Sequence, residues 1–305
     1  AILKPADLDT DLIVLISIAR GIAQRPLFSG ATWEFGNDWV CQFRRVGDQV
    51  HFVRRNVRYR ADPGSPVALA VAESYSDSIL AALPVVAEKR DGTVVVDLAS
   101  VYLSDLPNIQ KSLPGFEFSA EKSSWANVQG FAKNIELQVD ATYTSDGATE
   151  LEAVPDSRSL TIRVHYSISQ LPESNYQPRL ADDRVGYFLT VAKNFSSSSQ
   201  EDRFERYINR WHLEKQDPRE ELSEPKEPIV FWLEKTVPHK YRATIRAGIL
   251  EWNKAFERVG IKNAIVVRQQ ADDSPWHPGD IRYNTFRWIT SGLSVAMGPT
   301  RVNPH

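Results

Sequence analysis

The sequence predicts an α+β protein, in which a β-rich domain is followed by a strand-helix-strand-strand segment. Apolar and polar residues alternate in several short stretches of the first two thirds, which is typical of strands with one buried face. The stretch 214–228 is charged, contains proline and has almost no apolar residues. After it, two continuous apolar runs flank a segment of helical periodicity, which indicates a β-α-β unit. We therefore expect a β-rich N-terminal domain over 1–213, a linker over 214–228 and a second domain over 229–305.

Length and composition limit the class of function. The 305 residues suffice for about two domains of ordinary size. There are 36 basic and 39 acidic residues, and the formal net charge is −3, so we expect no nucleic-acid binding through bulk charge. No stretch approaches about 18 consecutive apolar residues, so no membrane span is expected. The single cysteine, Cys41, excludes an intrachain disulfide and a zinc site built from several cysteines.

The elements of the first domain follow from alternation and from turn residues. Residues 37–60 predict a hairpin that turns at Gly47-Asp48. A helix is expected over about 66–82, because apolar residues recur there every three or four positions and Pro84 would end the run. The apolar run 12–19 is short enough for a strand or a core helix. Further strands are expected at 93–97, 135–143, 159–169 and 187–193, and a loop tip at 196–199.

In the second domain, the apolar run 229–233 predicts a strand buried on both faces. Pro238 and Gly260 frame a helix of about 22 residues. Its apolar face carries Tyr241, Ile245, Gly248 or Ile249, Trp252, Phe256 and Val259. Two more strands are expected at 264–268 and 281–289. Because Trp252 would then lie under the helix, Trp252→Ala is expected to cost about 3–5 kcal/mol. We place most of the tryptophans of this region in the core (Trp211, Trp232, Trp252 and Trp288), and Trp276 in an exposed loop.

The chain carries no catalytic signature. It lacks a dinucleotide-binding glycine motif, a phosphate-binding loop, a nucleophile elbow and a His-Glu-x-x-His helix. Its histidines are dispersed, with no two at the i, i+4 spacing that lets one helix face hold a metal. They are His51, His165, His212, His239, His277 and His305. We therefore assign no catalytic residue and no metal ligand, and leave the substrate-binding residues unknown.

Three other features favour structural roles. Cys41 lies in an alternating strand without a neighbouring base, so we interpret it as a small apolar residue; a less favoured alternative is an inhibitory thiolate that caps a metal in a proenzyme. Paired carboxylates are expected to be solvated loop charges, at Asp9/Asp11, Asp182/Asp183 and Asp272/Asp273. A basic stretch is expected to pair with acidic residues across the sheet; it would bind a polyanion only if its arginines were exposed, and it contains Arg54, Arg55, Arg58 and Arg60.

A family resemblance rests on strings of residues. In the second domain these are Pro228-Ile-Val-Phe-Trp-Leu-Glu-Lys, Gly248-Ile-Leu-Glu-Trp-Asn-Lys-Ala-Phe-Glu-Arg-Val-Gly260, Lys262-Asn-Ala-Ile-Val-Val, Asp280-Ile-Arg-Tyr-Asn284 and Arg301-Val-Asn-Pro304. They resemble the opening of the catalytic domain of large bacterial zinc-dependent metalloproteases of the metzincin type, which carry an extended N-terminal domain of unknown function. Strings similar to that N-terminal domain are Ser17-Ile-Ala-Arg-Gly21, Phe43-Arg-Arg-Val-Gly-Asp48, Asn56-Val-Arg-Tyr-Arg-Ala-Asp62, Pro84-Val-Val-Ala87 and Val164-His-Tyr-Ser167.

The resemblance implies a scaffold without its catalytic centre. In that family, zinc is held by a helix bearing His-Glu-x-x-His-x-x-Gly-x-x-His, and the Glu activates the bound water. This sequence contains none of those residues, and Met297 is not the methionine turn, which follows the third histidine. The expected fold class is therefore a β-rich domain followed by the incomplete βαββ start of a metzincin-like zinc-protease domain. Residues 229–305 would form its truncated N-terminal subdomain, with zinc expected in the full-length parent and none in this chain.

Two functions follow as expectations. In the first, the chain is the N-terminal portion of a zinc-dependent metallopeptidase and is inactive alone, because the zinc helix lies beyond residue 305. In the alternative, it is a non-catalytic pro-region or protein-recognition module that docks on a separate chain. The implied partners are the remainder of the catalytic domain and a protein or peptide substrate, and an open sheet edge would favour self-association. The resemblance also implies a secreted, periplasmic or cell-envelope location.

Overall fold

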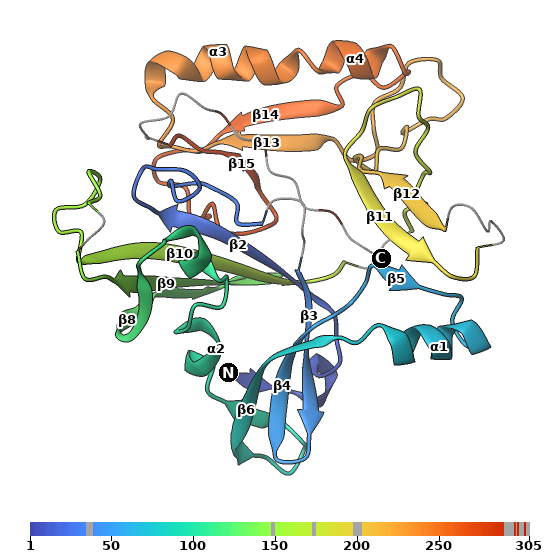
Figure 1. Cartoon of the computed structure of the whole chain (residues 1–305). Helices are drawn as coiled ribbons and strands as arrows, with labels where there is room; N and C mark the ends of the chain where they lie inside the picture. The colour runs from blue at the N-terminus through green and yellow to red at the C-terminus, as the bar shows by residue number, and fades with distance from the viewer. Residues whose placement is uncertain are drawn as a thin grey trace. The chain divides into compact units, whose positions relative to one another are not determined.

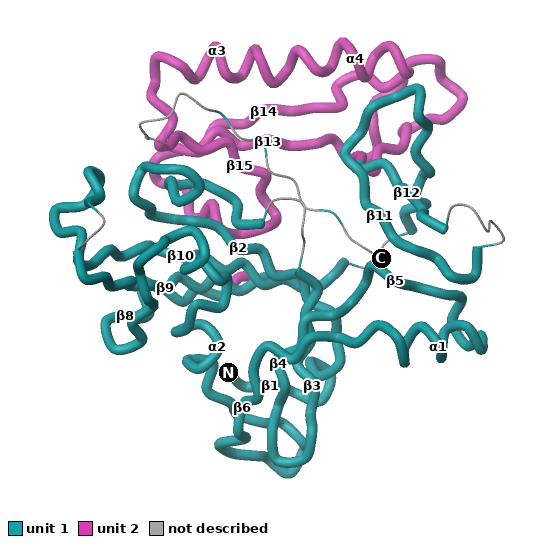
Figure 2. The backbone as a smooth tube through the Cα atoms, in the orientation of Figure 1, with its two compact units in different colours: residues 1–130, 134–209, 291–305 teal, residues 131–133, 210–290 magenta. Residues whose placement is uncertain are grey.

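A computed structural model describes residues 1–34, 39–147, 150–172, 175–197 and 203–289, together with 296, 298 and 302. The chain divides into two compact units (Figure 2). The first comprises residues 1–130, 134–209 and 291–305, and the second comprises 131–133 and 210–290. Within the described residues, no helix is both long and apolar enough to cross a membrane. Met297 lies outside the described residues, as does the string 301–304 apart from Val302.

The first unit is built on a curled nine-stranded antiparallel sheet (Figure 1), which confirms the expectation of a β-rich domain. Its strand order is β1-β7-β6-β4-β3-β2-β10-β9-β8. The strands are β1 (Ile2–Leu3), β2 (Leu12–Arg20), β3 (Trp39–Val46), β4 (Gln49–Arg54), β6 (Ser78–Glu88), β7 (Val94–Val96), β8 (Glu117–Gly130), β9 (Asn134–Thr144) and β10 (Ser159–Gln170). The apolar run 12–19 is therefore a strand, and the strands expected at 93–97, 135–143 and 159–169 are present.

Strict alternation along β10 places one face of the sheet in the core. Its even-numbered residues from Leu160 to Ile168 are buried apolar side chains, while the residues between them are polar and half-buried. Period-two alternation is what a strand between a core and a polar surface requires. The short helix α2 (Ala99–Tyr102) adds Tyr102 to this core, where its ring meets Tyr166 edge-on at 4.8 Å. The unit also contains two 3-10 helices, Pro5–Asp7 and Ile109–Ser112.

The predicted hairpin is confirmed by β3 and β4, which pair around Gly47-Asp48. Gly47 has φ of 61°, a left-handed conformation that a residue without Cβ adopts at little cost. The turn residues therefore located the hairpin correctly.

The helix expected over 66–82 is only partly correct. Helix α1 covers Pro66–Ser74 only. Its N-cap is Ser65, whose side chain accepts a hydrogen bond from the backbone N–H of Ala68 at 3.1 Å. Residues 78–88 form strand β6 instead, and Pro84 lies within it. The cause is tertiary: β6 pairs with β4 and buries Leu83 completely, which outweighs the helical preference of its alanines and leucines.

A smaller sheet of three strands belongs to the same unit. Its order is β12-β11-β5, formed by β12 (Phe204–Ile208), β11 (Leu189–Asn194) and β5 (Tyr59–Arg60). Strand β11 is antiparallel to β12 and parallel to β5. The strand expected at 187–193 is thus confirmed as β11, and the expected loop tip follows it, with 198–199 outside the described residues.

The second unit contains a parallel three-stranded sheet in the order β14-β13-β15. Its elements are β13 (Ile229–Leu233), α3 (His239–Leu250), α4 (Asn253–Glu257), β14 (Ile265–Gln269) and β15 (Asn284–Phe286). Both expected buried strands are present, and the third is shorter than the predicted 281–289. Within residues 214–228, Lys215 bridges to Pro225, and Ser223 bridges to Ile261, so this charged stretch is hydrogen-bonded within the second unit, to which it belongs.

The predicted helix of the second unit is interrupted, and its apolar face is narrower than expected. The helical segment breaks between Leu250 and Asn253. Trp252 is 65% exposed and Val259 is 69% exposed, so neither belongs to the core. The two helices pack against this three-stranded sheet through four half-buried side chains, Ile245, Ile249, Leu250 and Phe256. The expectation of a buried Trp252 is therefore wrong.

Candidate functional site

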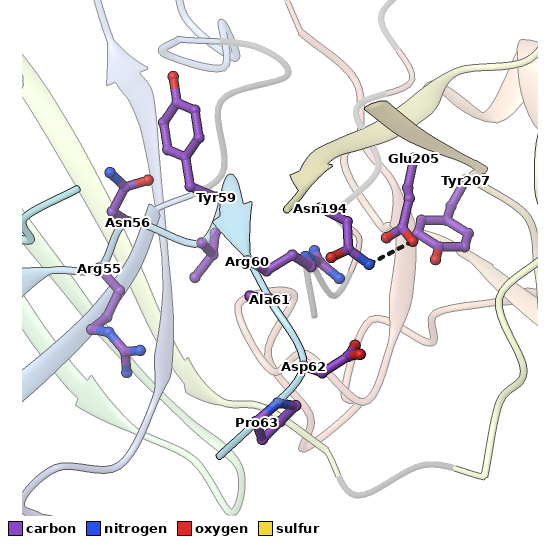
Figure 3. Close-up of a pocket in the computed structure, with 11 residues that line it drawn as sticks. Arg55, Asn56, Tyr59, Arg60, Ala61, Asp62, Pro63, Asn194, Glu205 and Tyr207 are labelled. Carbon is purple, nitrogen blue, oxygen red and sulfur yellow. Dashed lines mark hydrogen bonds between the residues drawn. The ribbon is translucent and has the colours of Figure 1, made fainter. Parts of the chain in front are cut away.

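A cleft of about 480 Å³ opens on one face of the small sheet in the first unit (Figure 3). It is lined by the chain around β5, between Arg55 and Pro63, and by Asn194, Glu205 and Tyr207. Clefts of this size are typical of small-molecule sites. Figure 3 shows the side chains of Arg60 and Asn194 directed toward Glu205, with Tyr207 beside it.

Strand register explains why residues from three parts of the chain meet here. Asn194 on β11 is the parallel partner of Arg60 on β5. Glu205 pairs with Ala192, and Tyr207 pairs with Thr190, so both lie on the face that carries Asn194. The Asn194 Nδ2 donates to Glu205 Oε1 at 2.9 Å. Burial raises the pKa of Tyr207, and the charge and hydrogen bond of Glu205 raise it further.

Two arginines of the basic stretch at this cleft, Arg54 and Arg55, lie within ion-pair distance of acidic residues. Arg55 lies 3.1 Å from Asp11 and 3.4 Å from Asp77. Burial alone would raise the pKa of Asp77, but hydrogen bonds from the Asn56 backbone and from Arg44, with the charge of Arg55, hold it below its usual value. This pairing matches the expectation at Arg55, whereas Arg58 is exposed.

Arg54 also lies beside an acidic residue, and it packs on an aromatic ring. Its guanidinium lies 4.2 Å above the ring of Trp39 and 3.7 Å from the Glu34 carboxylate. Desolvation by burial lowers its pKa. An arginine held in this way contributes to packing more than to the surface potential.

A second polar cluster crosses strands β2, β10 and β9 of the large sheet. His165 on β10 lies between Ser17 on β2 and Glu136 on β9: its Nδ1 is 3.1 Å from Ser17 Oγ, and its Nε2 is hydrogen-bonded to the Glu136 carboxylate. Ser167 Oγ donates to Glu136 Oε1 at 2.6 Å, and Asn134 also donates to that oxygen. Glu136 is 4% exposed, so these three donors replace the water that a buried carboxylate loses.

This order of serine, histidine and carboxylate is that of an activated nucleophile, but the surroundings differ. Ser17 and His165 are cross-strand partners within paired strands. Their backbone N–H groups belong to the ladders, so they are not arranged as donors for an oxyanion. We interpret the cluster as a satisfied polar row that fixes the register of β2, β10 and β9. Both residues lie in strings that resemble the family's N-terminal domain, but nothing in the sequence indicates that these positions, 148 residues apart, meet.

In the second unit, a buried carboxylate lies at the carboxyl ends of the parallel strands. Glu234 directly follows β13 and is 4% exposed. Its Oε2 accepts from Arg287 Nε at 2.9 Å and from Thr236 Oγ1 at 2.8 Å. Gln270, which follows β14, accepts from the Lys235 backbone N–H at 3.1 Å. Ligands often bind at this end of a parallel sheet, but here the chain's own residues occupy these groups.

The described residues do not offer a metal site. Among them, no three or more side chains of His, Cys, Asp and Glu are grouped so as to hold a metal ion. His212 lies 3.4 Å from Glu214, and His277 stacks on Phe131 at 5.7 Å. His51 lies in β4, His239 begins α3, and His305 is outside the described residues. The zinc implied by the resemblance therefore does not fit the residues described here.

Cys41 is completely buried and unpaired by a disulfide. Burial raises the pKa of its thiol to about 12, so the thiolate that a nucleophile or metal ligand requires is strongly disfavoured.

The paired carboxylates and the tryptophans singled out from the sequence are not grouped into a site. Asp9 lies 3.4 Å from Arg44, Asp182 lies 2.6 Å from Arg184, and Asp272 and Asp273 are exposed. Trp276 was expected to be an exposed contact, but it stacks on Tyr283 at 4.4 Å and meets Trp232 at 5.2 Å. The expectation that most of the tryptophans lie in the core is wrong for three of them, which are at least 41% exposed: Trp211, Trp252 and Trp288.

Comparison with known families finds one family whose model matches more than half of the chain. The model of the family described as "Domain of unknown function (DUF5117)" matches residues 34–216. The chain therefore belongs to that family, and the matched region includes every residue that lines the cleft. No curated protein and no solved structure matches the chain.

Proposed function

We propose that this chain is the N-terminal part of a zinc-dependent metallopeptidase of the metzincin type, with the zinc-binding helix beyond residue 305. The observation that supports the proposal is the parallel unit of β13, α3, α4, β14 and β15. The four of these strings that lie within residues 228–284 fall in one strand-helix-strand-strand unit, in which β13 pairs in parallel with both β14 and β15. The family match over residues 34–216 suits an N-terminal domain of unknown function ahead of that unit.

In this proposal the described chain supplies scaffold rather than chemistry. Zinc would polarise the scissile carbonyl and activate water, using ligands that this sequence does not contain. The described residues hold the sheet in place: Ile229, Leu233, Ile265 and Val267 form its core against the helices. The Glu234–Arg287 pair fixes the strand ends. The protein or peptide substrate, and a secreted, periplasmic or cell-envelope location, belong to the same proposal.

The test compares two products of the same gene. A product extended past residue 305 should contain about one zinc per chain and should cleave peptides in a manner that a chelator abolishes. The 305-residue chain should do neither. Zinc and peptidase activity in the shorter chain, or their absence from an extended product, would overturn the proposal.

The second candidate is a non-catalytic pro-region or recognition module, and the cleft favours it. The cleft lies entirely within the matched family region and is independent of the parallel sheet. A recognition module should bind a separately expressed remainder of the catalytic domain in a 1:1 complex on gel filtration with light scattering. Failure to bind at micromolar concentrations would count against this second function.

A further inference from the structure

We infer that the cleft between β5, β11 and β12 binds a neutral carbohydrate through the hydroxyl groups of one or two sugar rings. This inference goes beyond the proposed peptidase role and does not depend on it. It rests on the charge balance of the cleft, on the kinds of polar groups that converge there, and on an aromatic ring beside them.

Charge balance argues against a strongly charged ligand. The cleft is lined by two arginines, Arg55 and Arg60, and two carboxylates, Asp62 and Glu205. Arg55 is already within ion-pair distance of Asp11 and Asp77 outside the cleft. No sign of charge dominates the lining, so neither a phosphate nor a polyamine gains the electrostatic complementarity that guides charged ligands to their sites.

The polar groups that converge in the cleft suit adjacent hydroxyls. Carboxylates only accept hydrogen bonds, a guanidinium only donates, and an amide and a phenol do both. A sugar hydroxyl also donates and accepts, and two neighbouring hydroxyls match the two-pronged geometry of a carboxylate or a guanidinium. The cleft places all four groups together, on Arg60, Asp62, Asn194, Glu205 and Tyr207.

Two of these side chains are already oriented. Asn194 Oδ1 accepts from the Ser196 backbone N–H at 2.9 Å, while its Nδ2 donates to Glu205. Glu205 also lies close enough to Tyr207 for its charge to raise the pKa of the phenol, in addition to the effect of burial. The Asp62 carboxylate makes no hydrogen bond or ion pair within the part of the chain that the structure describes, and its own backbone N–H is tied to Ser196 Oγ at 2.8 Å. Pre-oriented polar groups reduce the entropy that binding costs.

The ring of Tyr207 supplies an apolar surface beside the polar groups (Figure 3). An aromatic ring with a polar tip packs against C–H groups on its face while its hydroxyl hydrogen-bonds. A peptide backbone, in contrast, offers single N–H and C=O groups that do not present paired hydroxyls to Asp62 or Glu205. The chemistry therefore favours a sugar over an extended peptide.

The experiment titrates the whole 305-residue chain with cellobiose, maltose and N,N′-diacetylchitobiose at tens of millimolar, and follows the Asn194 side-chain amide and the Tyr207 ring by NMR. At least one of the disaccharides should shift these signals in a saturable way. Glu205→Gln keeps the side-chain shape and the acceptor for Asn194, and it should weaken binding about tenfold; Tyr207→Phe, which removes only the hydroxyl, should do the same. Inorganic phosphate and trialanine serve as probes of the competing classes.

Arg206→Gln is the matched control. Arg206 lies between Glu205 and Tyr207 in β12, so its side chain points to the opposite face of the sheet, where it lies 5.5 Å from the Phe204 ring. Binding should be unchanged in this variant. The inference is overturned if no disaccharide shifts the signals, if Arg206→Gln weakens binding as much as Glu205→Gln does, or if phosphate or trialanine binds in the cleft and the sugars do not. None of these results bears on zinc or peptidase activity.

Discussion

Asn253 on α4 pairs with Ile265 on β14 as a neighbouring strand would. Its Oδ1 accepts from the Ile265 backbone N–H at 2.8 Å, and its Nδ2 donates to the Ile265 carbonyl at 3.0 Å. Arg246 on α3 donates to the backbone carbonyl of Val267, two residues further along the same strand, at 2.6 Å. Because β14 is an edge strand, two helix side chains occupy groups that would otherwise pair with another chain. Self-association through an open edge, expected from the sequence, is thus opposed at β14.

We expect Asn253→Ala to expose this edge. The substitution removes both hydrogen bonds, so the Ile265 amide should exchange with solvent faster by an amount equal to about 1–2 kcal/mol of local stability. Hydrogen exchange followed by NMR measures this directly, and light scattering would report any new association. Lys254→Ala is the control, because its side chain is 74% exposed. Unchanged exchange at Ile265 would show that the Asn253 pairing does not protect the strand.

Two buried tyrosines should respond in opposite ways to loss of the hydroxyl. Tyr102 is fully buried, and its hydroxyl has no hydrogen-bond partner within the described residues. Tyr143 is equally buried, but its hydroxyl donates to Asp105 at 2.8 Å. Tyr102→Phe should leave the free energy of unfolding unchanged or raise it by about 1 kcal/mol, whereas Tyr143→Phe should lower it by about 1–2 kcal/mol. Urea denaturation of both variants tests the contrast, and equal losses would contradict it.

Sequence patterns were informative where short-range rules decide the structure. The Gly47-Asp48 turn gave the hairpin, and the alternation of β10 gave the buried face. These features depend on backbone conformation and on the period of a strand, and both can be read within about ten residues. Periodicity was misleading at residues 78–82, where pairing with β4 outweighed local preference.

The candidate site could not be located from the sequence for the same reason. The string Asn56–Asp62 was singled out, but nothing in it indicates that Arg60 aligns with Asn194, 134 residues further along the chain by their numbering. The positions of Glu205 and Tyr207 depend on a second register, between β11 and β12. A site assembled from several strand registers leaves no spacing signal in one sequence, unlike a metal motif on a single helix.

Acid should weaken the ion pairs of the large sheet in a defined direction. Asp140 on β9 has a pKa below its usual value of 3.8, first because Arg163 hydrogen-bonds to it and also because Arg163 and Arg20 are positively charged; burial opposes these effects. The folded state therefore holds fewer protons at this site than the unfolded state. The resulting stability is fully present above about pH 4 and is lost as the pH falls through the lower pKa of the folded state.

Arg163→Gln should remove most of this contribution and leave the part that comes from Arg20. The guanidinium of Arg163 makes two hydrogen bonds of 2.8 Å to the Asp140 carboxylate. Its removal should raise the pKa of Asp140 toward 3.8 and should lower stability at neutral pH by about 1 kcal/mol. NMR titration of the carboxylate and urea denaturation at several pH values measure the two effects. Arg158→Gln, which removes an exposed partner of Asp156, is the control; if it matched Arg163→Gln in its pH dependence, the assignment to Asp140 would fail.

The face of the interrupted helix in the second unit is tested by a pair of substitutions. Trp252 lies between α3 and α4 and is 65% exposed, while Phe256 is half-buried and packs against the core of the parallel sheet. Trp252→Ala should therefore change the free energy of unfolding by less than about 1 kcal/mol, and Phe256→Ala should lower it by about 2 kcal/mol through the cavity it leaves. Denaturation followed by circular dichroism is suitable, because it does not depend on tryptophan fluorescence. A loss of 3 kcal/mol or more for Trp252→Ala, the value expected for a core residue, would mean that the indole is covered in solution.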